Sequence, residues 1–105
     1  MTIEISIIIP TYNEEKYIQN AINSILDCDL DPKTIEVIIV DGCSNDNTCL
    51  KVKELIPKHN NIFILENKMR HIPHALNIGI KNASGHIIIR ADAHCEYLYN
   101  YVSNL

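Results

Sequence analysis

An apolar run that leads directly into an acid and a cluster of small polar residues is the feature that most constrains this chain. Residues 35–40 are mainly Ile and Val, and Asp41 and the segment Gly-Cys-Ser-Asn-Asp-Asn-Thr follow them. This order is typical of a buried strand that delivers an aspartate to the carboxyl edge of a parallel sheet, where open α/β folds bind their ligands. Residues 6–15 and 85–94 show the same order, so the sequence predicts that three strand ends form one site.

Apolar runs and helical periodicity alternate along the chain and predict four strands and three helices. The strands are continuously apolar, which indicates a parallel sheet that helices cover on both faces. Right-handed crossovers, with the fourth strand beside the first, predict the strand order 3-2-1-4 in a three-layer αβα, Rossmann-like α/β fold. The expected strands are residues 3–9, 35–40, 61–65 and a run directly after Gly85, and the expected helices are about 14–26, 45–56 and 73–83.

Local signals are expected to set the ends of these elements. Pro10 should end the first strand, because proline cannot donate a hydrogen bond to a ladder. Thr11 and Glu14 have the spacing of a capping box for the first helix. Gly79 would allow the third helix to pack closely on a strand, and Gly85 would cap that helix.

Length and composition exclude several classes of protein. The 105 residues suit one domain, and a net charge of −4 argues against a nucleic-acid partner held by phosphate neutralisation, though not against a nucleotide. No run approaches the ~20 apolar residues of a membrane span, and we expect no secretory leader before the first strand. The cysteines lack C-x-x-C spacing, which argues against structural zinc, and we expect them to be reduced thiols of a cytoplasmic protein.

The residues at the predicted strand ends suit a nucleotide ligand. Asp41 can accept a hydrogen bond from a base, Thr11 and Tyr12 can frame a flat ring, and Glu14 can accept from ribose hydroxyls. These acids also have a plainer interpretation, because Asp41 and Asp46 could cap the second helix and Glu14 could be only a capping-box partner. The convergence of three strand ends at one edge favours the shared site.

Asp92 and His94 suit a metal ion. They stand two residues apart after the fourth strand, and in an extended segment both side chains would point to one side. A carboxylate with an imidazole suits Mn²⁺ or Mg²⁺, and the nitrogen ligand favours manganese. Such an ion would bridge a diphosphate and neutralise it as it leaves. An Asp-x-His triplet also occurs by chance in many chains, so the pair is a weak signal when taken alone.

Four segments together resemble the N-terminal, nucleotide-sugar-binding half of family 2 glycosyltransferases of the A-type fold. The first two segments are strong signals in this order and spacing, and the resemblance covers essentially the whole chain. It implies an inverting glycosyltransferase whose donor is a sugar on a nucleoside diphosphate, usually with uridine. The segments are residues 6–14, 40–48, 75–85 and 92–94.

The resemblance also implies which residues line the donor. Asp41 would meet the base, Arg70 would lie near the base or the phosphates, and Asp92 would face ribose and the metal. Without the resemblance, Arg70 would most often be a solvated loop residue. The implied donor-binding residues are Thr11, Tyr12, Glu14, Asp41, Arg70 and Asp92, and the implied metal ligands are Asp92 and His94.

The chain departs from the family pattern in two ways. His94 stands where the family usually has aspartate, which resembles a subgroup that makes bacterial exopolysaccharides such as succinoglycan and leaves the site one negative charge poorer. The family's general base and acceptor site lie in a C-terminal half that these 105 residues lack. We therefore expect residues 1–105 to be a truncated donor-binding domain without catalytic residues. The whole protein would use a saccharide or lipid-linked acceptor, at the inner face of the membrane.

Two other interpretations use the same parallel sheet. A non-catalytic receiver-like or flavodoxin-like module also places an acid at a strand end, but a receiver needs an acidic pair where Pro10 and Thr11 stand. A nucleotidyltransferase for sugar activation needs a glycine-rich, basic loop after the first strand, and residues 11–15 are acidic instead.

The fourth strand is expected to be an exposed edge. Residues 87–89 are all isoleucine, and an apolar edge of this kind can pair with another chain. The segment Tyr97-Leu98-Tyr99 would either fold over this edge or exchange with a neighbour. The sequence therefore predicts self-association.

Overall fold

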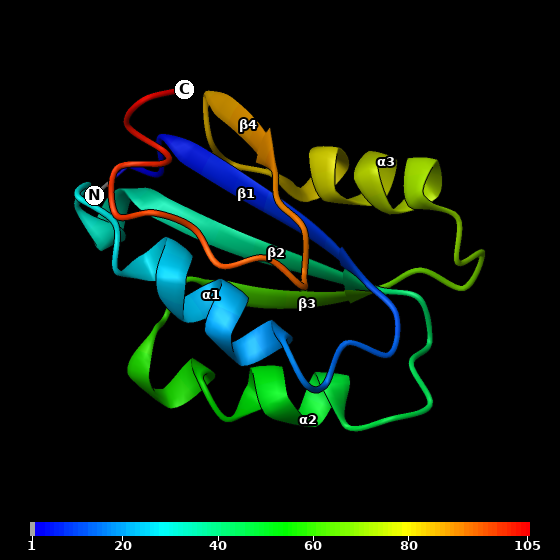
Figure 1. The fold of residues 1–105 in the computed structure, drawn as a ribbon. Coiled ribbons are helices and arrows are strands. Elements are labelled where there is room, and N and C mark those ends of the chain that lie inside the picture. The colour runs from blue at the N-terminus through cyan, green and yellow to red at the C-terminus, as the bar shows by residue number, and fades with distance from the viewer. Residues whose placement is uncertain (1) are drawn as a thin grey trace.

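Four parallel strands form the centre of the molecule in the order β3-β2-β1-β4 (Figure 1). The structure is a computed structural model and describes residues 2–105. The predicted parallel sheet and the predicted strand order are both confirmed. The strands are β1 Ile5–Thr11, β2 Ile35–Asp41, β3 Ile62–Glu66 and β4 Ile87–Arg90.

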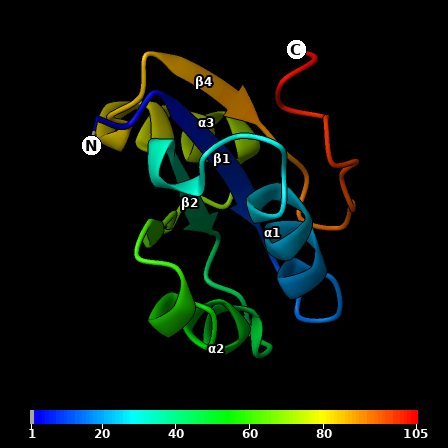
Figure 2. The ribbon, with the colours of Figure 1, turned by 90° about the vertical axis from the view of Figure 1, so that its left-hand side faces the viewer.

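Helices cover both faces of this sheet, as the sequence predicts. In Figure 2, α1 and α2 lie on one side of the strands and α3 lies on the other. None of the helices within residues 2–105 has the length and hydrophobicity needed to cross a membrane. The helices are α1 Ile18–Leu26, α2 Thr48–Lys53 and α3 Ile72–Asn82, with short 3-10 helices at Pro32–Thr34 and Ile56–Lys58.

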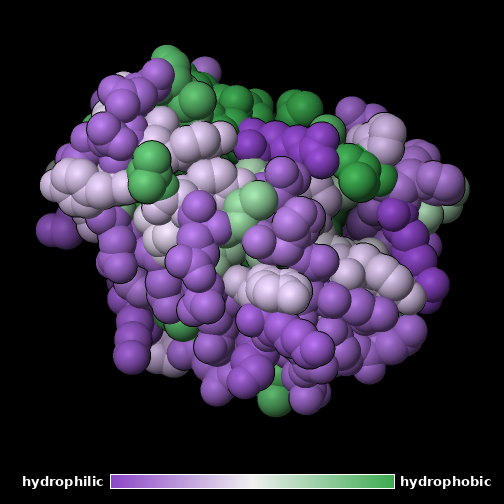
Figure 3. All heavy atoms as spheres, in the orientation of Figure 1, coloured by the Kyte–Doolittle hydropathy of each residue, from purple (hydrophilic) through white to green (hydrophobic). Residues whose placement is uncertain are grey.

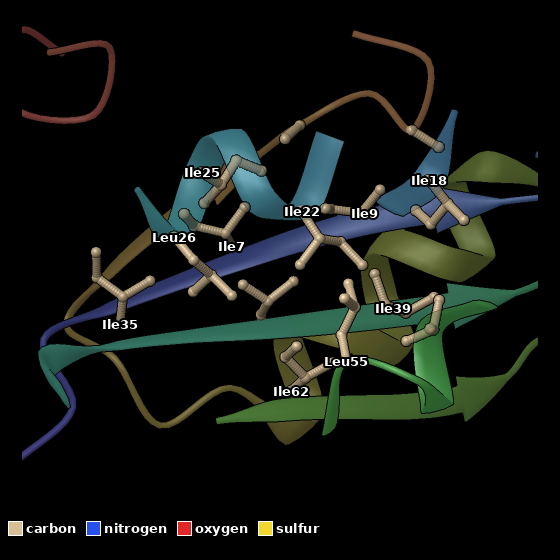
Figure 4. Packing of buried hydrophobic residues seen from close by; sticks show 14 of the residues in the cluster. Ile7, Ile9, Ile18, Ile22, Ile25, Leu26, Ile35, Ile39, Leu55 and Ile62 are labelled. Carbon is tan, nitrogen blue, oxygen red and sulfur yellow. The ribbon is translucent and has the colours of Figure 1, made fainter. Parts of the chain in front are cut away.

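The alternation of side chains along β1 and β2 divides the core into two clusters. Ile7 and Ile9 of β1 face the apolar stripe of α1, and Figure 4 shows them beside Ile25 and Ile22 of that helix. Ile8 points to the opposite face and packs under α3. Each fully buried isoleucine contributes about 1.5–3 kcal/mol. Because both faces are buried, the central strands need apolar residues at nearly every position.

The first strand does not end where proline was expected to end it. β1 runs through Pro10 to Thr11, and Pro10 is paired in register with Val40. The Ile8 carbonyl accepts a hydrogen bond from the Ala91 amide, so the backbone N–H and C=O of Ile8 point toward β4. The backbone of Pro10, two residues further along the strand, points to the same side. The pairing of β1 with β4 ends at Ile8 and Arg90. The missing N–H of proline therefore falls where no partner strand remains, which removes its cost.

The predictions for the two glycines of the third crossover have opposite outcomes. Gly79 is buried in α3, and a Cβ there would lie 2.7 Å from a side-chain carbon of Ile8, so the predicted close packing on β1 is confirmed. Gly85 was expected to cap α3, but that helix ends at Asn82 with Ala83 as its C-cap. Gly85 lies instead against the backbone of β1.

The segment after β4 returns over the α1 face of the sheet. Tyr97 and Tyr101 pack against the first core cluster, and Val102 is buried in it. The expected fold of the tail over the β4 edge is therefore wrong within residues 2–105. Ile87 and Ile88 stay 56% and 44% exposed. Figure 3 shows hydrophobic atoms gathered along the top of the molecule, over β4.

Candidate functional site

A cavity of about 230 Å³ opens at the carboxyl edge of the sheet, between the ends of β1 and β4 and the start of α3. Its walls come from residues at or after the ends of all four strands, and these include the three strand ends that the sequence predicts. Asp41 is the one predicted donor or metal residue that does not line this cavity. The predicted residues that line it are Thr11, Tyr12, Glu14, Arg70, Asp92 and His94.

Asp41 lies just behind the cavity wall and is only 5% exposed. Its carboxylate accepts hydrogen bonds from the Thr11 hydroxyl at 2.7 Å, and from the Ser44 amide and hydroxyl at 2.8 and 2.6 Å. Asp41 therefore joins the end of β1 to the loop before α2 and does not cap that helix. The predicted contact between Asp41 and a base stays a prediction.

The loops that follow β1 and β2 are joined to each other. The Glu14 amide donates to the Thr48 hydroxyl at 2.8 Å, and the Glu15 amide donates to Asp46 at 3.3 Å. Burial by itself would raise the pKa of Asp46, but hydrogen bonds from Thr48 and Glu15 outweigh it and hold that pKa below its usual value.

The predicted capping box between Thr11 and Glu14 is wrong. Among the described residues, α1 begins at Ile18 without a side-chain cap.

Three residues in these loops have left-handed backbone conformations that are uncommon outside glycine. They are Asn13, Cys43 and Arg70, with φ of 53°, 61° and 62°, and each follows a different strand. Such a conformation costs on the order of 1–3 kcal/mol and persists only where the surrounding structure enforces it. The strain is tolerated at Asn13, whose side-chain oxygen accepts from the Asn45 amide at 2.8 Å.

Arg70 lies over the aromatic ring of Tyr12. The guanidinium carbon is 5.1 Å from the ring centroid, which is the geometry of a cation–π contact. Tyr12 is 42% exposed, and its hydroxyl accepts from the Asn45 amide group at 3.3 Å. The pair therefore presents a flat ring and a fixed positive charge at the mouth of the cavity.

Glu14 and His94 meet inside the cavity. The Oε2 atom of Glu14 is buried and has no hydrogen-bond partner within residues 2–105, and it lies 3.4 Å from Nδ1 of His94. The His94 side chain is 61% exposed. A carboxylate beside one ring nitrogen is the usual arrangement of a histidine whose other nitrogen binds a metal.

Alternating burial places Asp92 and His94 on the cavity side. Ala91 and Ala93 are each 3% exposed and belong to the first core cluster, so the side chains between and after them point away from it. The segment turns here, because the Cys95 amide donates to the Asp92 carbonyl at 3.3 Å. Both residues line the same cavity despite this turn.

The residues present fit a metal that is shared with a bound diphosphate. Within residues 2–105 no three His, Cys, Asp or Glu side chains gather into a group that could hold an ion by themselves. Asp92 and His94 supply an oxygen and a nitrogen donor, and a Mg²⁺ or Mn²⁺ site normally completes its shell with substrate phosphates and water.

Two polar side chains of the wall, Asn67 and Arg90, are absent from the sequence prediction. Asn67 directly follows β3, is 2% exposed, and donates its backbone amide to the Asp41 carbonyl at 2.7 Å. Arg90 ends β4, and its guanidinium lies 3.5 Å from the Asp92 carboxylate, with both side chains about half exposed. A polar residue after the third strand was the signal that could have identified Asn67.

The four cysteines take no part in this cavity and are free thiols. The Cys43 thiol donates to the Glu66 carboxylate at 3.3 Å, and this hydrogen bond raises its pKa. Burial raises the pKa of Cys49 to about 11. Both thiols therefore stay protonated near neutral pH, which argues against a nucleophilic role.

The known proteins that this chain resembles in sequence are glycosyltransferases. Glycosyl transferase family 2 matches residues 6–105. A dolichyl N-acetyl-α-D-glucosaminyl phosphate 3-β-D-2,3-diacetamido-2,3-dideoxy-β-D-glucuronosyltransferase of Methanococcus voltae is 43% identical over 95% of this chain, which spans 32% of that protein. The poly(ribitol-phosphate) β-N-acetylglucosaminyltransferase TarS of Staphylococcus aureus is 35% identical over 84% of this chain, which spans 16% of that protein.

Solved structures show the same architecture. Residues 1–349 of S. aureus TarS in complex with UDP-GlcNAc superimpose with a TM-score of 0.85 at 28% identity, over 97% of this chain and 30% of that one. The mannosyltransferase PcManGT of Pyrobaculum calidifontis in complex with GDP-Man and Mn²⁺ gives a TM-score of 0.89 at 28% identity, over 99% of this chain and 31% of that one. The parallel sheet is thus that of A-type glycosyltransferases, and the chain belongs to glycosyl transferase family 2.

Proposed function

We propose that this chain is the donor-binding part of an inverting glycosyltransferase. The donor would be a nucleotide-diphospho-sugar, most simply a UDP-sugar, and the acceptor a saccharide or lipid-linked chain in cell-envelope or exopolysaccharide synthesis. The observation that carries the proposal is the cavity at the carboxyl edge of the sheet, where an exposed aromatic ring, a fixed arginine and an Asp-x-His pair meet. The TarS complexes with UDP and UDP-GlcNAc support a uridine donor.

Different residues of the cavity would contact different parts of the donor. The ring of Tyr12 and the guanidinium of Arg70 would frame the nucleoside, and the charge of Arg70 would attract the phosphates. Asp92 and His94 would hold a divalent cation, Mn²⁺ or Mg²⁺, which supplies charge neutralisation for the diphosphate. Glu14 has two candidate partners here, the ribose hydroxyls and the His94 ring, and its 3.4 Å distance to that ring supports the second.

The acceptor side of the reaction would lie outside these residues. The chain spans about a third or less of the first relatives, so a general base and an acceptor pocket would come from further sequence or from a partner. We infer that residues 1–105 alone bind a donor without transferring the sugar. Turnover of a nucleotide-sugar onto an acceptor by these residues alone would contradict this inference.

We further propose that the whole protein works in the cytoplasm, at the inner face of the membrane. The Methanococcus voltae relative is named for a dolichyl phosphate substrate, and such substrates are lipid-linked. Fractionation of cells that express the whole protein would test this location.

The binding experiment compares Asp41→Ala with Asp27→Ala. We expect uridine diphosphate to bind the unaltered chain weakly and Asp41→Ala to abolish detectable binding. Without the Asp41 carboxylate, the N–H group of the base would be buried without a hydrogen-bond acceptor, which costs ~1–3 kcal/mol. Asp41→Ala also removes three hydrogen bonds within the protein and so lowers its stability. Isothermal titration calorimetry is therefore used, because it measures affinity directly and does not depend on a melting temperature. Asp27 is exposed at the end of α1, so its replacement should leave affinity unchanged.

A ligand without a nucleoside, inorganic pyrophosphate, is the control for base recognition. Titrations with uridine diphosphate and with inorganic pyrophosphate, each with and without Mn²⁺, separate base recognition from phosphate binding. Equal affinity for the two ligands would show that the base is not recognised and that the proposed role of Asp41 is wrong.

Self-association through the β4 edge is a separate expectation. Ile87 and Ile88 are exposed, and within residues 2–105 β4 pairs only with β1, so its outer side offers unpaired backbone groups to a second copy of this chain. We expect the unaltered chain to dimerise or form larger species at high micromolar concentration, and Ile88→Lys to shift it toward monomer. Light scattering checks both, and a clean monomer for the unaltered chain would refute the expectation.

A further inference from the structure

We propose that Tyr97 is a positioning residue for the Asp-x-His segment, and this inference rests on the proposed donor site. Its phenol hydroxyl accepts a hydrogen bond from the Asp92 amide at 2.6 Å and also lies 3.5 Å from the Asp92 carbonyl oxygen. Tyr97 itself does not line the cavity. It would therefore act on the donor only by fixing the backbone that carries Asp92 and His94.

The strand geometry explains why Asp92 needs such a partner. The Ala91 amide makes the last ladder bond of this segment, to the Ile8 carbonyl at 3.0 Å. Amides of successive residues in an extended chain point to opposite sides. The Asp92 amide therefore points to the side on which β4 has no neighbouring strand among the described residues 2–105. The Tyr97 hydroxyl supplies the acceptor that a further strand would otherwise supply.

Tyr97 is itself held by the body of the domain. Its backbone amide donates to the Ser24 hydroxyl of α1 at 2.9 Å, and that hydroxyl donates to the Ala21 carbonyl at 2.8 Å. The rings of Tyr97 and Tyr101 are 4.5 Å apart and pack on the first core cluster. The position of Asp92 is thus coupled to the docking of residues 95–105 on α1.

The test compares Tyr97→Phe with Tyr101→Phe in the whole 105-residue chain. The first change removes the hydroxyl that contacts Asp92 and keeps the ring. The second change removes the hydroxyl of Tyr101, whose ring packs beside that of Tyr97. The Tyr101 hydroxyl makes no hydrogen bond within residues 2–105. Both variants keep the aromatic packing, so both should fold.

Two measurements separate positioning from a general loss of structure. Amide hydrogen exchange at Asp92, followed by NMR without ligand, should accelerate about fivefold or more in Tyr97→Phe, because a hydrogen bond of ordinary strength is lost. Affinity for uridine diphosphate should fall about fivefold in the presence of Mn²⁺ and stay unchanged without it. Tyr101→Phe should change neither quantity.

Three outcomes would overturn the inference. Unchanged exchange at Asp92 would show that the hydroxyl does not hold this amide. Equal weakening with and without Mn²⁺, or the same effects in Tyr101→Phe, would show a general structural role. If the unaltered chain binds no uridine diphosphate, the proposed function is wrong and the positioning role with it, whereas the exchange result still decides whether the hydrogen bond exists.

Discussion

Glu36→Ala is expected to lower the free energy of unfolding by about 3 kcal/mol, which is a large part of the total for a domain of this size. Glu36 is 4% exposed, and its Oε2 atom accepts from the Ser6 hydroxyl and from the Ser84 amide, both at 2.6 Å. The Ser6 hydroxyl accepts in turn from the Gly85 amide at 2.8 Å. One carboxylate therefore joins β1, β2 and the turn that leads from α3 to β4.

The destabilisation arises because alanine leaves these donors without their acceptor. Thermal or urea unfolding followed by circular dichroism measures it, and a loss of this size lowers the midpoint of a ~100-residue domain by roughly 12–24 °C. Glu36→Gln keeps an acceptor oxygen and should cost about 1 kcal/mol. Glu4→Ala removes an exposed carboxylate just before β1 and should be neutral. Equal midpoints for Glu36→Ala and Glu4→Ala would show that the buried carboxylate does not stabilise the turn.

Gly85→Ala is expected to cost about 2–3 kcal/mol through overpacking. A Cβ at this position would lie 2.7 Å from the Ser6 backbone nitrogen and hydroxyl oxygen and 2.8 Å from the Ile5 carbonyl carbon. These backbone atoms belong to a strand that is paired on both sides, so they cannot move away without breaking the ladder. The added methyl group must therefore displace β4 or the turn before it.

Gly42→Ala is the matched control for this prediction. A Cβ at Gly42 would meet Arg70 and the Thr11 carbonyl oxygen at 3.5 Å, which is an ordinary contact distance, and Gly42 does not have a positive φ. Its replacement should change the free energy of unfolding by less than about 0.5 kcal/mol. Urea titration of both variants checks the contrast. If Gly42→Ala costs as much as Gly85→Ala, steric contact with β1 does not explain why glycine occupies position 85.

Element lengths were the least predictable part of the fold. The first helix was expected to begin near Glu14 but begins at Ile18, because the residues between them form a turn in which the Glu14 carbonyl accepts from the amides of Tyr17 and Ile18. The second helix was expected to reach Ile56 and to stop before Pro57, but α2 ends at Lys53 and a 3-10 helix contains that proline. The first expectation rested on the capping-box spacing of Thr11 and Glu14, and the second on apolar spacing, which an irregular turn can also satisfy.

The sequence by itself determined the layers, the strand order and the edge of the sheet at which the cavity lies. Strands buried on both faces need continuous apolar runs, and right-handed crossovers then allow few arrangements. The residues that end such strands must meet at one edge, so Thr11, Asp92 and His94 could be assigned to one site before any contact was known.

Only the tertiary structure decided which partner each polar group takes. Thr11 could have bonded locally to the Glu14 amide, but its hydroxyl donates to Asp41, thirty residues away along the chain. The parallel register sets Thr11 directly beside Asp41 on the next strand, so the distant carboxylate is nearer in space than the local amide. The same reason applies to Tyr97, which reaches Asp92 only because α1 holds the returning chain in place.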